Sequence, residues 1–325
     1  MDKNTRLSTI KDETDIPRMH QNPRWNKLSE YFLYHFSARV QKIPLDAGAS
    51  CPNRDGTLSR EGCIFCNPQG SGTGFGMAGL DLEGQWFAWR EHFRSKGIHL
   101  FMAYLQSFSN TYGPIEQLER VLGILAHLPD MVGLSVGTRP DCLDADKLAL
   151  LAAQPQTEKW LEIGVQSCHD ATLTRIRRGH SRACAEQAVL TAHEAGLKVC
   201  VHLMAGLPGE SAQDFLDSVR WLVEQPVDGV KFHSVYVCRD TGLADMFVRG
   251  EYTPLSQAEY VALMVEALPL LRPEIIVHRT TGDPFSGEML APDWVLRSRD
   301  TNNKLLAELV RHNTWQGKDW NGQRP

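Results

Sequence analysis

Residues 46–67 read DAGASCPNRDGTLSREGCIFCN, a segment in which Cys51, Cys63 and Cys66 follow the spacing C-x11-C-x2-C. The segment comes directly after residues 40–45, a short run that is typical of a β-strand. All three thiols therefore fall in one predicted loop, and a loop closes around a compact inorganic group at little cost in chain entropy. Thiolates are the soft ligands that iron–sulfur centres require. Three of them leave one iron of a four-iron cluster open to direct coordination by a substrate or cofactor.

A structural zinc loop is the alternative for these three thiols. Structural zinc takes four closed ligands, and the nearest other candidates in the sequence are His92, His99 and the distant Cys142. The remaining five cysteines occur singly, which is unlike the disulfide framework of a secreted protein. Clustered thiols of this kind are typical of metal binding in a reducing compartment.

Working outward from the loop, the sequence alternates short apolar runs with longer stretches of helical periodicity, which indicates repeated βαβ units. Right-handed crossovers make such a sheet parallel, and its chemistry lies at the carboxyl ends of the strands. With six repeats instead of eight, we expect a partial (β/α)6 barrel of the TIM type. The expected strands are 40–45, 99–105, 131–136, 160–165, 198–204 and 229–235, and the expected helices lie near 84–95, 114–127, 144–153, 181–195 and 211–224.

The segments outside these repeats complete the predicted domain organisation. After the sixth strand we expect a small C-terminal α/β extension over residues 241–310, with a helix near 256–270 and an apolar strand at 274–278. The barrel itself is expected over 26–240, with the cysteine loop extending over 46–80 and a mobile glycine-rich part, GSGTGFGMAG, at 70–79. Residues 1–25 are expected to form a flexible arm and residues 311–325 a frayed tail.

Composition limits the class of protein. The chain has 325 residues, of which 42% are hydrophobic and 22% charged, a profile typical of a globular protein. Its formal net charge of −5 offers no strong overall field that would attract nucleic acid. The charged first twenty residues do not resemble a signal peptide, and no apolar stretch reaches membrane-spanning length. We therefore expect a cytoplasmic protein without a membrane partner.

Several motifs resemble the radical S-adenosylmethionine (SAM) superfamily. Besides the cysteine loop, they include IPLDAGASCPNRDG, NTYGP, GTRPDCL, EIGVQSCHDATLTRIRRGH, VHLMAGLPGES and GVKFHSVYVCRDTGLA, in an order that spans roughly residues 38–283. The set is similar to the bacterial YhcC and YtqA group, which is related to the catalytic subunit of Elongator. The long C-x11-C spacing is similar to the extended loops of that subunit, whereas the commonest spacing in the superfamily is C-x3-C-x2-C.

The resemblance implies the cofactors and the reaction type. Cys51, Cys63 and Cys66 would hold a [4Fe–4S] cluster whose open iron is chelated by the amino and carboxylate groups of SAM. One electron, supplied by a reductant such as flavodoxin or ferredoxin, would cleave a carbon–sulfur bond of SAM. The resulting 5′-deoxyadenosyl radical would abstract a hydrogen atom from the substrate, while the protein contributes positioning and redox tuning.

The resemblance also implies residues that contact SAM. Phe65 matches the aromatic residue usual before the last cysteine, and Gln106 and Ser107 occupy the place of a glycine-glycine-glutamate turn that holds the methionyl amino group, although the acidic residue is missing here. Arg178 is the expected cofactor contact from its place in RRGH, whereas the other basic residues of 175–182 can equally form a solvated surface run.

Further candidates come from positions on or after the predicted strands. Glu162 and Gln166 can offer hydrogen bonds to ribose or methionyl groups, although an ion pair between Glu162 and an arginine of 175–182 is the alternative. Gly206 and Gly209 would let the backbone approach a flat adenine. Arg139 and Asp141 are expected to contact the substrate or to brace the barrel mouth.

Three functions are compatible with this sequence. The first is radical modification of a transfer-RNA base, because the similar group includes members linked to remodelling of the wobble-uridine side chain. The second is radical chemistry on a small metabolite, as in the oxygen-independent coproporphyrinogen oxidases. The third is a zinc-stabilised RNA-binding module without catalytic activity.

Overall fold

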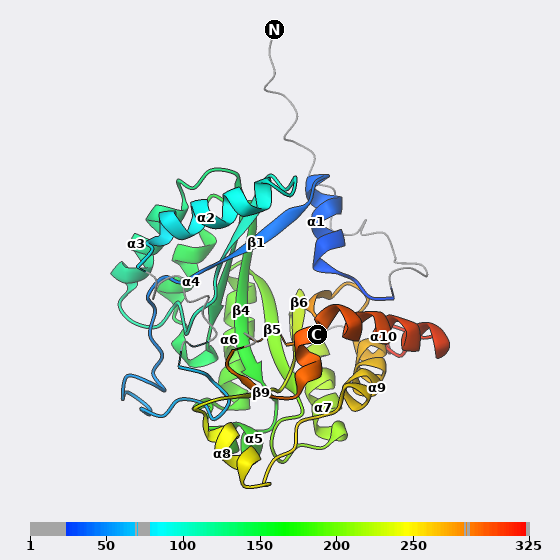
Figure 1. The fold of residues 1–325 in the computed structure, drawn as a ribbon. Helices are drawn as coiled ribbons and strands as arrows, with labels where there is room; N and C mark the ends of the chain where they lie inside the picture. Colours follow the sequence, from blue (N-terminus) through cyan, green and yellow to red (C-terminus); the bar gives the residue numbers. More distant parts are fainter. Residues whose placement is uncertain (1–23, 69, 71–78, 283, 285–286, 323–325) are drawn as a thin grey trace.

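The computed structural model describes residues 24–68, 70, 79–282, 284 and 287–322 (Figure 1). Seven parallel strands form one curled sheet in the order β1-β2-β3-β4-β5-β6-β8. A small antiparallel pair, β7 and β9, makes a second sheet. The strands are β1 (Val40–Leu45), β2 (Leu100–Leu105), β3 (Met131–Thr138), β4 (Glu158–Gln166), β5 (Lys198–Ala205), β6 (Gly229–Ser234), β7 (Val237–Cys238), β8 (Ile276–Arg279) and β9 (Met289–Ala291).

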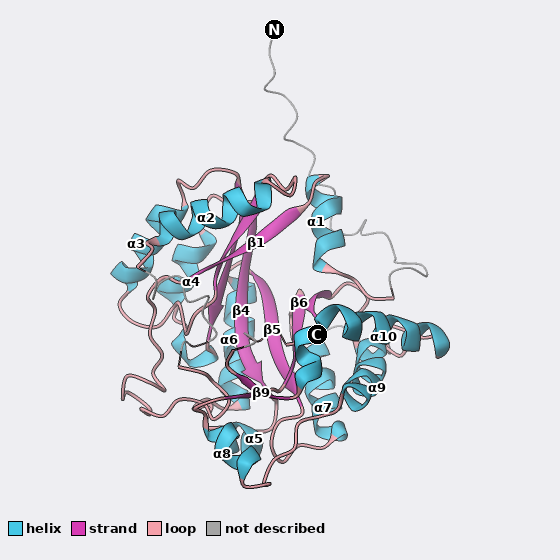
Figure 2. Cartoon of the chain, in the orientation of Figure 1, coloured by secondary structure: helices cyan, strands magenta, loops and turns pink. Residues whose placement is uncertain are grey.

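Helices surround the outside of the curled sheet (Figure 2). They are α1 (Leu28–Phe36), α2 (Leu82–Arg94), α3 (Ile115–Leu125), α4 (Ala145–Ala152), α5 (Asp170–Arg175), α6 (Arg182–Glu194), α7 (Ala212–Val223), α8 (Gly242–Val248), α9 (Gln257–Ala267) and α10 (Ser298–Arg311). Local sequence fixes where several of them begin. At α7, for example, the side chains of Ser211 and Asp214 form a reciprocal capping box that satisfies two otherwise unpaired backbone N–H groups.

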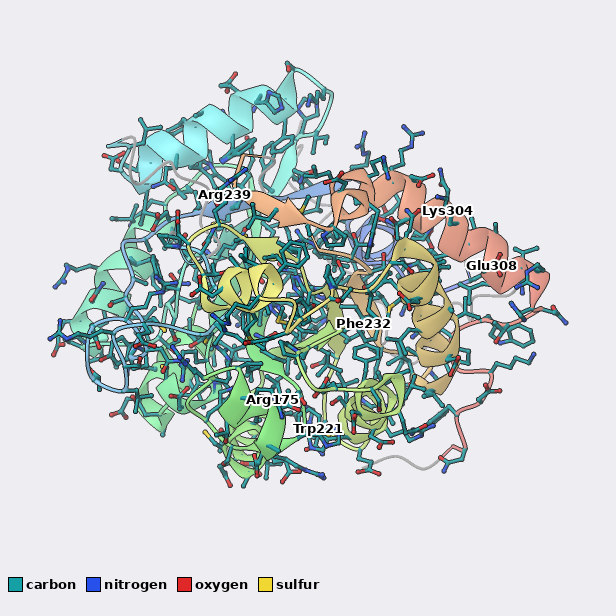
Figure 3. The ribbon with its side chains drawn as sticks, turned by 60° about the horizontal axis from the view of Figure 1, so that its bottom comes forward. Arg175, Trp221, Phe232, Arg239, Lys304 and Glu308 are labelled. Atoms are coloured by element: carbon teal, nitrogen blue, oxygen red, sulfur yellow. The ribbon has the colours of Figure 1, made fainter. Side chains whose placement is uncertain are left out.

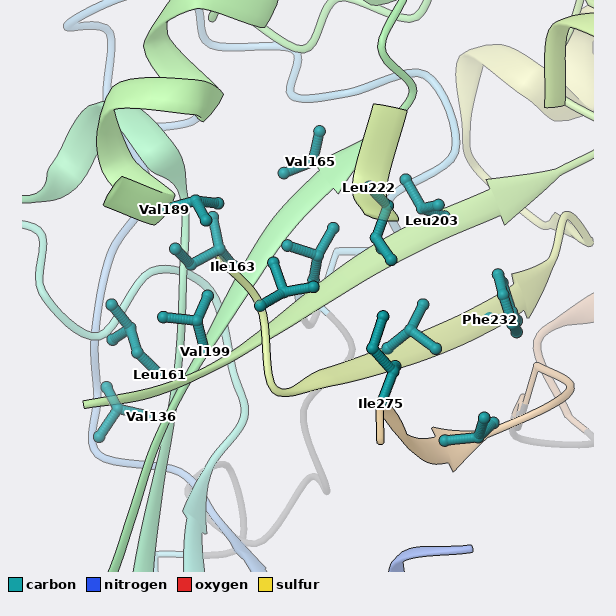
Figure 4. Close-up of a cluster of buried hydrophobic side chains, with 14 of the residues drawn as sticks. Val136, Leu161, Ile163, Val165, Val189, Val199, Leu203, Leu222, Phe232 and Ile275 are labelled. Carbon is teal, nitrogen blue, oxygen red and sulfur yellow. The ribbon is translucent and has the colours of Figure 1, made fainter. Parts of the chain in front are cut away.

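The two faces of the strands have different chemistry, because alternate residues of a strand point to opposite sides. On β4, Leu161, Ile163 and Val165 point outward and pack against the helices in one continuous hydrophobic core. Figure 4 shows these three side chains beside others from β5, α6 and α7. On the inner face of β4, Glu162, Gly164 and Gln166 border a cavity. Towards its carboxyl end, the sheet therefore has an apolar outside and a polar inside.

Helix α1 lies at the amino end of the strands, opposite the end near α5 and α8 (Figure 1). Its Leu28, Tyr31 and Phe32 are buried in a cluster with inward-facing strand residues that include Trp160. Glu158 is also buried there, and its carboxylate accepts hydrogen bonds of 2.8 Å from the Tyr31 hydroxyl and of 2.8 Å from the Trp160 indole N–H. The amino end of the barrel is thereby filled, and its one described buried carboxylate has partners on both oxygens.

The expected α/β half-barrel is confirmed, and all six predicted strands are present. One difference concerns the strand expected at 274–278, because β8 does not stand apart in the extension but continues the main sheet beside β6. Ile275 and Val277 pack into the same core as the barrel strands, which buries apolar surface and gives β6 a hydrogen-bonding neighbour. Residues 241–310 therefore contribute to the barrel core, while the boundary at 240 stays a prediction.

The expected frayed tail is wrong for the described part of residues 311–322. Thr314 and Gln316 are buried, and the Gln316 amide nitrogen donates to the Ile275 carbonyl oxygen at 2.7 Å. The Gln316 side-chain oxygen also accepts a hydrogen bond from the Asn26 backbone N–H at 2.8 Å. Specific hydrogen bonds thus hold this segment against β8. The expected arm (1–25, apart from residues 24 and 25) and most of the expected mobile loop (70–79) lie outside the described residues.

Candidate functional site

The three clustered cysteines lie in the loop between β1 and α2, and all three thiols are free. Arg54 stabilises the loop because its guanidinium donates to the carbonyl oxygens of Cys66 and Asn67, each at 2.7 Å. Immediately before Cys63, Gly62 has a φ of +77°, and a Cβ there would lie 3.2 Å from the Arg54 guanidinium. A glycine at this position therefore allows the loop to turn tightly around Arg54.

The loop packs on the segment after β4, which carries the RRGH motif. The Asn53 amide donates to the backbone carbonyl of Arg177 at 2.8 Å and lies 3.4 Å from the Cys63 sulfur. Arg178 is buried, donates to the Gly164 carbonyl oxygen at 2.5 Å and places another guanidinium nitrogen 3.6 Å from the Cys63 sulfur. Two donors, one of them cationic, thus face this sulfur, as a thiolate ligand requires.

The three cysteines border one cavity of about 210 Å³ at the carboxyl end of the sheet. Among the described residues, no three His, Cys, Asp or Glu side chains are close enough to hold a single metal ion. The three thiols share the lining of one cavity. Burial, reinforced by the neighbouring Cys63, raises the pKa of Cys66. Clustered buried thiols of this kind become thiolates when a metal centre supplies positive charge. The donor set therefore fits a cluster with several metal atoms.

The structure brings nine of the thirteen sequence-predicted site residues to this cavity. They are Cys51, Cys63, Phe65, Cys66, Gln106, Arg139, Glu162, Gln166 and Arg178. Gln166 ends β4 with a φ of +79°, a conformation that is strained for a residue with a side chain. The register of β4 against β5 also shifts between Gly164 and Gln166. This local irregularity turns the end of β4 towards the cysteine loop.

Four predicted residues do not border the cavity. Ser107 is buried, and its hydroxyl has no hydrogen-bond partner among the described residues. The Asp141 carboxylate accepts hydrogen bonds of 2.9 and 2.8 Å from the Arg139 guanidinium, an arrangement that braces Arg139 at the cavity wall. Gly206 and Gly209 both have positive φ, and the side chains of Leu255 and Arg175, respectively, stand over the positions that a Cβ would take.

The basic segment 175–182 divides into buried and exposed members. Arg177 is exposed and pairs with Glu61, and Arg182 is exposed and pairs with Glu186. Arg178 alone among these three faces the cavity. Figure 3 shows Arg175 among the side chains near this end of the barrel. The segment therefore combines one cavity residue with a solvated surface run.

Glu162 lies deeper in the barrel, where its carboxylate has several partners. Lys42 pairs with one oxygen, and the Ser135 hydroxyl donates to the same oxygen at 2.6 Å. The other oxygen lies 2.9 Å from the Lys231 ammonium and 2.8 Å from His202 Nε2. The alternative ion pair with an arginine of 175–182 is thus wrong, because these lysines from β1 and β6 face β4 across the curled sheet.

Charge and burial determine the ionisation of this group. Burial alone would raise the pKa of Glu162, but Lys231 and Lys42 hold it well below its usual range. Burial lowers the pKa of Lys231 to about 8, against the opposing effect of Glu162. Burial, together with Lys231, lowers the pKa of His202 to about 4. At neutral pH the cluster therefore holds an ionised Glu162 and an uncharged His202.

Sequence reasoning did not select Lys231, Tyr104 or His202 as site residues, although all three border the cavity. Strand alternation carried the signal, because each lies between outward apolar residues, as Lys231 does between Val230 and Phe232. Sequence reasoning also missed Tyr236 and Glu288, which complete the cavity wall together with Cys238. Glu288 accepts a hydrogen bond of 2.6 Å from Asn67 in the cysteine loop.

Family models match most of the chain. The Radical SAM superfamily matches residues 57–222, and the Radical_SAM C-terminal domain matches residues 227–311. Among curated proteins, the uncharacterized protein YtqA of Bacillus subtilis is 34% identical over 305 residues, which cover 93% of this chain and 95% of YtqA. The tRNA uridine(34) acetyltransferase of Dehalococcoides mccartyi is 31% identical over 155 residues, which cover 47% of this chain and 33% of that protein.

The fold is also similar to a solved structure, the archaeal Methanocaldococcus infernus Elp3 with an N-terminal deletion. The TM-score is 0.67 at 19% identity, and the match covers 85% of this chain and 64% of the solved chain. The expected resemblance to the YtqA group and to Elongator-type proteins is confirmed. The chain belongs to the radical SAM superfamily and is an enzyme whose cofactors are a [4Fe–4S] cluster and SAM.

Proposed function

We propose that this enzyme uses Cys51, Cys63 and Cys66 to hold the cluster and remodels the side chain of a wobble uridine in transfer RNA. The observation that carries the first part is the position of three free thiols around one cavity, with the cationic Arg178 beside Cys63. The second part is supported by similarity to a relative whose name specifies uridine 34 of transfer RNA.

The residues around the cysteines have distinct roles in this proposal. Asn53 and Arg178 direct N–H groups at the Cys63 sulfur and thereby stabilise its thiolate. Phe65, Gln106 and Gln166 border the space next to the thiols and position SAM. When bound, SAM and the cluster would supply the radical chemistry that removes a hydrogen atom from the substrate. The enclosing wall limits access of competing hydrogen donors.

The remaining predicted cofactor contacts act from behind the cavity wall. Ser107, whose hydroxyl has no partner among the residues that the structure describes, can turn it towards bound SAM, and the backbone at Gly206 and Gly209 shapes the adenine side. Arg139, held by Asp141, faces the substrate. Glu162 acts from deeper in the barrel, below the cysteine loop.

A one-electron reductant is required for chemistry of this class, and we propose flavodoxin or ferredoxin as the donor. Transfer RNA and these small redox proteins meet in the cytoplasm, where we place the enzyme. Among the described residues, no helix is both long and apolar enough to cross a membrane.

Nucleoside analysis of transfer RNA tests the proposed substrate. We expect bulk transfer RNA from a deletion strain grown without oxygen to accumulate one modified wobble uridine and to lack another. Anaerobically reconstituted enzyme, given SAM and a reductant, should convert the first into the second, and the Cys63→Ser variant should not. An unchanged nucleoside profile in the deletion strain would refute the transfer-RNA function.

A further inference from the structure

Two lysines share a single buried carboxylate inside the barrel. Lys42 on β1 and Lys231 on β6 both pair with Glu162 on β4, whose side chain is fully buried. Burying ionised groups is costly unless their charges are compensated. Among the described residues, two lysines pair directly with this one carboxylate.

The three neighbouring histidines do not change this charge balance. Burial and the two lysines lower the pKa of His202 to about 4, and burial and Lys42 lower that of His278 to about 3. Burial, together with His202, holds the pKa of His233 well below its usual range. All three are therefore neutral at pH 7. Arg279, in register with Lys231 on β8, also lowers the pKa of Lys231 through its positive charge.

Lys231 is accessible from the cavity that the cysteines border. Lys231, Tyr104, His202 and His233 all belong to its wall. The Lys231 ammonium lies 2.9 Å from Glu162 and 3.0 Å from the Tyr104 hydroxyl. An ammonium has three N–H donors, so Lys231 can direct one towards a ligand. His233 Nε2 is buried and has no hydrogen-bond partner among the described residues.

We propose that Lys231, supported by Lys42, binds a carboxylate group carried by the substrate, with His233 as a second donor to that group. The inference rests on the proposed function, because it places this carboxylate on the wobble-uridine side chain. An anionic group at this position would balance the second lysine. Binding of this group would also fix how deeply the substrate enters. A carbon next to the carboxylate would then lie in the cavity that the cysteines border.

The position of Lys231 favours a side-chain carboxylate over a backbone phosphate. Lys231 lies three residues before the end of β6, below the layer that contains Gln166 and Met204. A backbone phosphate is flanked by two ribose groups, and both would have to follow it to the depth of the buried Lys231. A short terminal carboxylate on a slender side chain can reach it.

Calorimetric titration of the anaerobically reconstituted holoenzyme tests this site. The probes are 5-carboxymethyluridine, its uncharged methyl ester, uridine 5′-monophosphate and uridine. We expect the carboxylate to bind at least about tenfold more tightly than the ester, as a charge-assisted hydrogen bond predicts. Lys231→Met should abolish that preference. Lys304→Met, on exposed α10 away from the centre of the carboxyl end (Figure 3), should retain it.

The outcomes are distinguishable. The subsite is overturned if wild-type enzyme binds the carboxylate and the ester equally or binds neither. It is also overturned if the preference for the carboxylate survives in Lys231→Met. Tighter binding of uridine 5′-monophosphate than of uridine, lost in Lys231→Met, overturns it in favour of a phosphate site. If circular dichroism shows that Lys231→Met is unfolded, Lys231→Gln, which keeps a donor for Glu162, replaces it with the same expected result. If the deletion strain has an unchanged nucleoside profile but the wild-type enzyme prefers the carboxylate to the ester and Lys231→Met does not, only the transfer-RNA function is refuted.

Discussion

Two glutamates of the same strand, Glu158 and Glu162, are both buried inside the barrel but stand in opposite surroundings. Glu158 lies at the amino end, where α1 covers it and Tyr31 and Trp160 donate to its two oxygens. Glu162 lies four residues further along β4, between two lysines and next to an open cavity. The comparison shows that burial of a carboxylate does not by itself indicate function. Glu162 differs from Glu158 in the excess of positive charge around it and in its access from the cavity.

Cofactor binding at the carboxyl end of the barrel should depend on the thiols, whereas the packing of the amino end under α1 should not. We expect Cys63→Ala to reduce iron from about four atoms per chain to nearly none and to abolish SAM cleavage. The barrel should remain folded, because the loop and not the core depends on this side chain. Iron analysis, deoxyadenosine formation and circular dichroism after anaerobic reconstitution measure these effects. Normal iron content in the variant would remove Cys63 from the ligand set.

Replacing each glutamate in turn compares the two surroundings directly. Glu162→Ala leaves Lys42 and Lys231 without their shared counterion and should cost about 3–5 kcal/mol in the free energy of unfolding. Glu158→Ala removes hydrogen bonds in a site whose one lysine partner, Lys198, is partly exposed, and it should cost about 1–3 kcal/mol. Urea denaturation of the apo chain at pH 7 gives both values. A larger loss of stability in Glu158→Ala than in Glu162→Ala would show that the two lysines do not make Glu162 the more costly carboxylate to remove.

Arg177 and Arg178 are neighbours in the sequence, but only Arg178 is buried at the carboxyl end of the barrel. Arg178→Met removes the buried cation beside Cys63, and we expect about tenfold weaker SAM binding, equivalent to about 1.4 kcal/mol. Arg177→Met is the matched control, because Arg177 is exposed and pairs with Glu61 on the surface. Equilibrium dialysis with labelled SAM distinguishes them. Similar losses in both variants would argue for a general electrostatic effect.

Acid should weaken the fold through Glu162. Its pKa in the folded chain lies well below the ordinary value of 4.5. The stability from this group is therefore fully present above about pH 5 and is lost as the pH falls below 4.5. Between pH 6 and pH 4 we expect the wild type to lose about 1 kcal/mol more than Glu162→Gln. Denaturation curves at both pH values measure this, and parallel losses would place the acid sensitivity elsewhere.

Local sequence patterns predicted the strands and the cysteine loop well, because both depend on nearby residues. The predicted and observed bounds of β1 agree at Val40 and Leu45. The apolar alternation of β4 and the RRGH motif also placed Glu162, Gln166 and Arg178 near the carboxyl end. Period-two alternation and loop-forming residues are encoded within a few positions of one another.

The partners of Glu162 could not be predicted in the same way. Lys42, Glu162 and Lys231 are far apart in the chain and meet only because the sheet curls. An acidic residue in a strand indicates that some partner exists, but the curvature that selects lysines over the nearby arginines is a property of the whole sheet. For the same reason β8 was expected apart from the barrel, although it is the neighbour of β6.

The hydrogen bonds of Gln316 have a practical consequence for work with shortened proteins. This one amide joins the backbone before α1, 290 residues away in sequence, to the turn that leads into β8. Trimming the protein at Arg311 would remove these hydrogen bonds, and we expect it to loosen β8, the strand that covers the edge of β6. Bare strand edges pair with other molecules, so such a protein should aggregate. Expression clones for crystallisation should retain this glutamine.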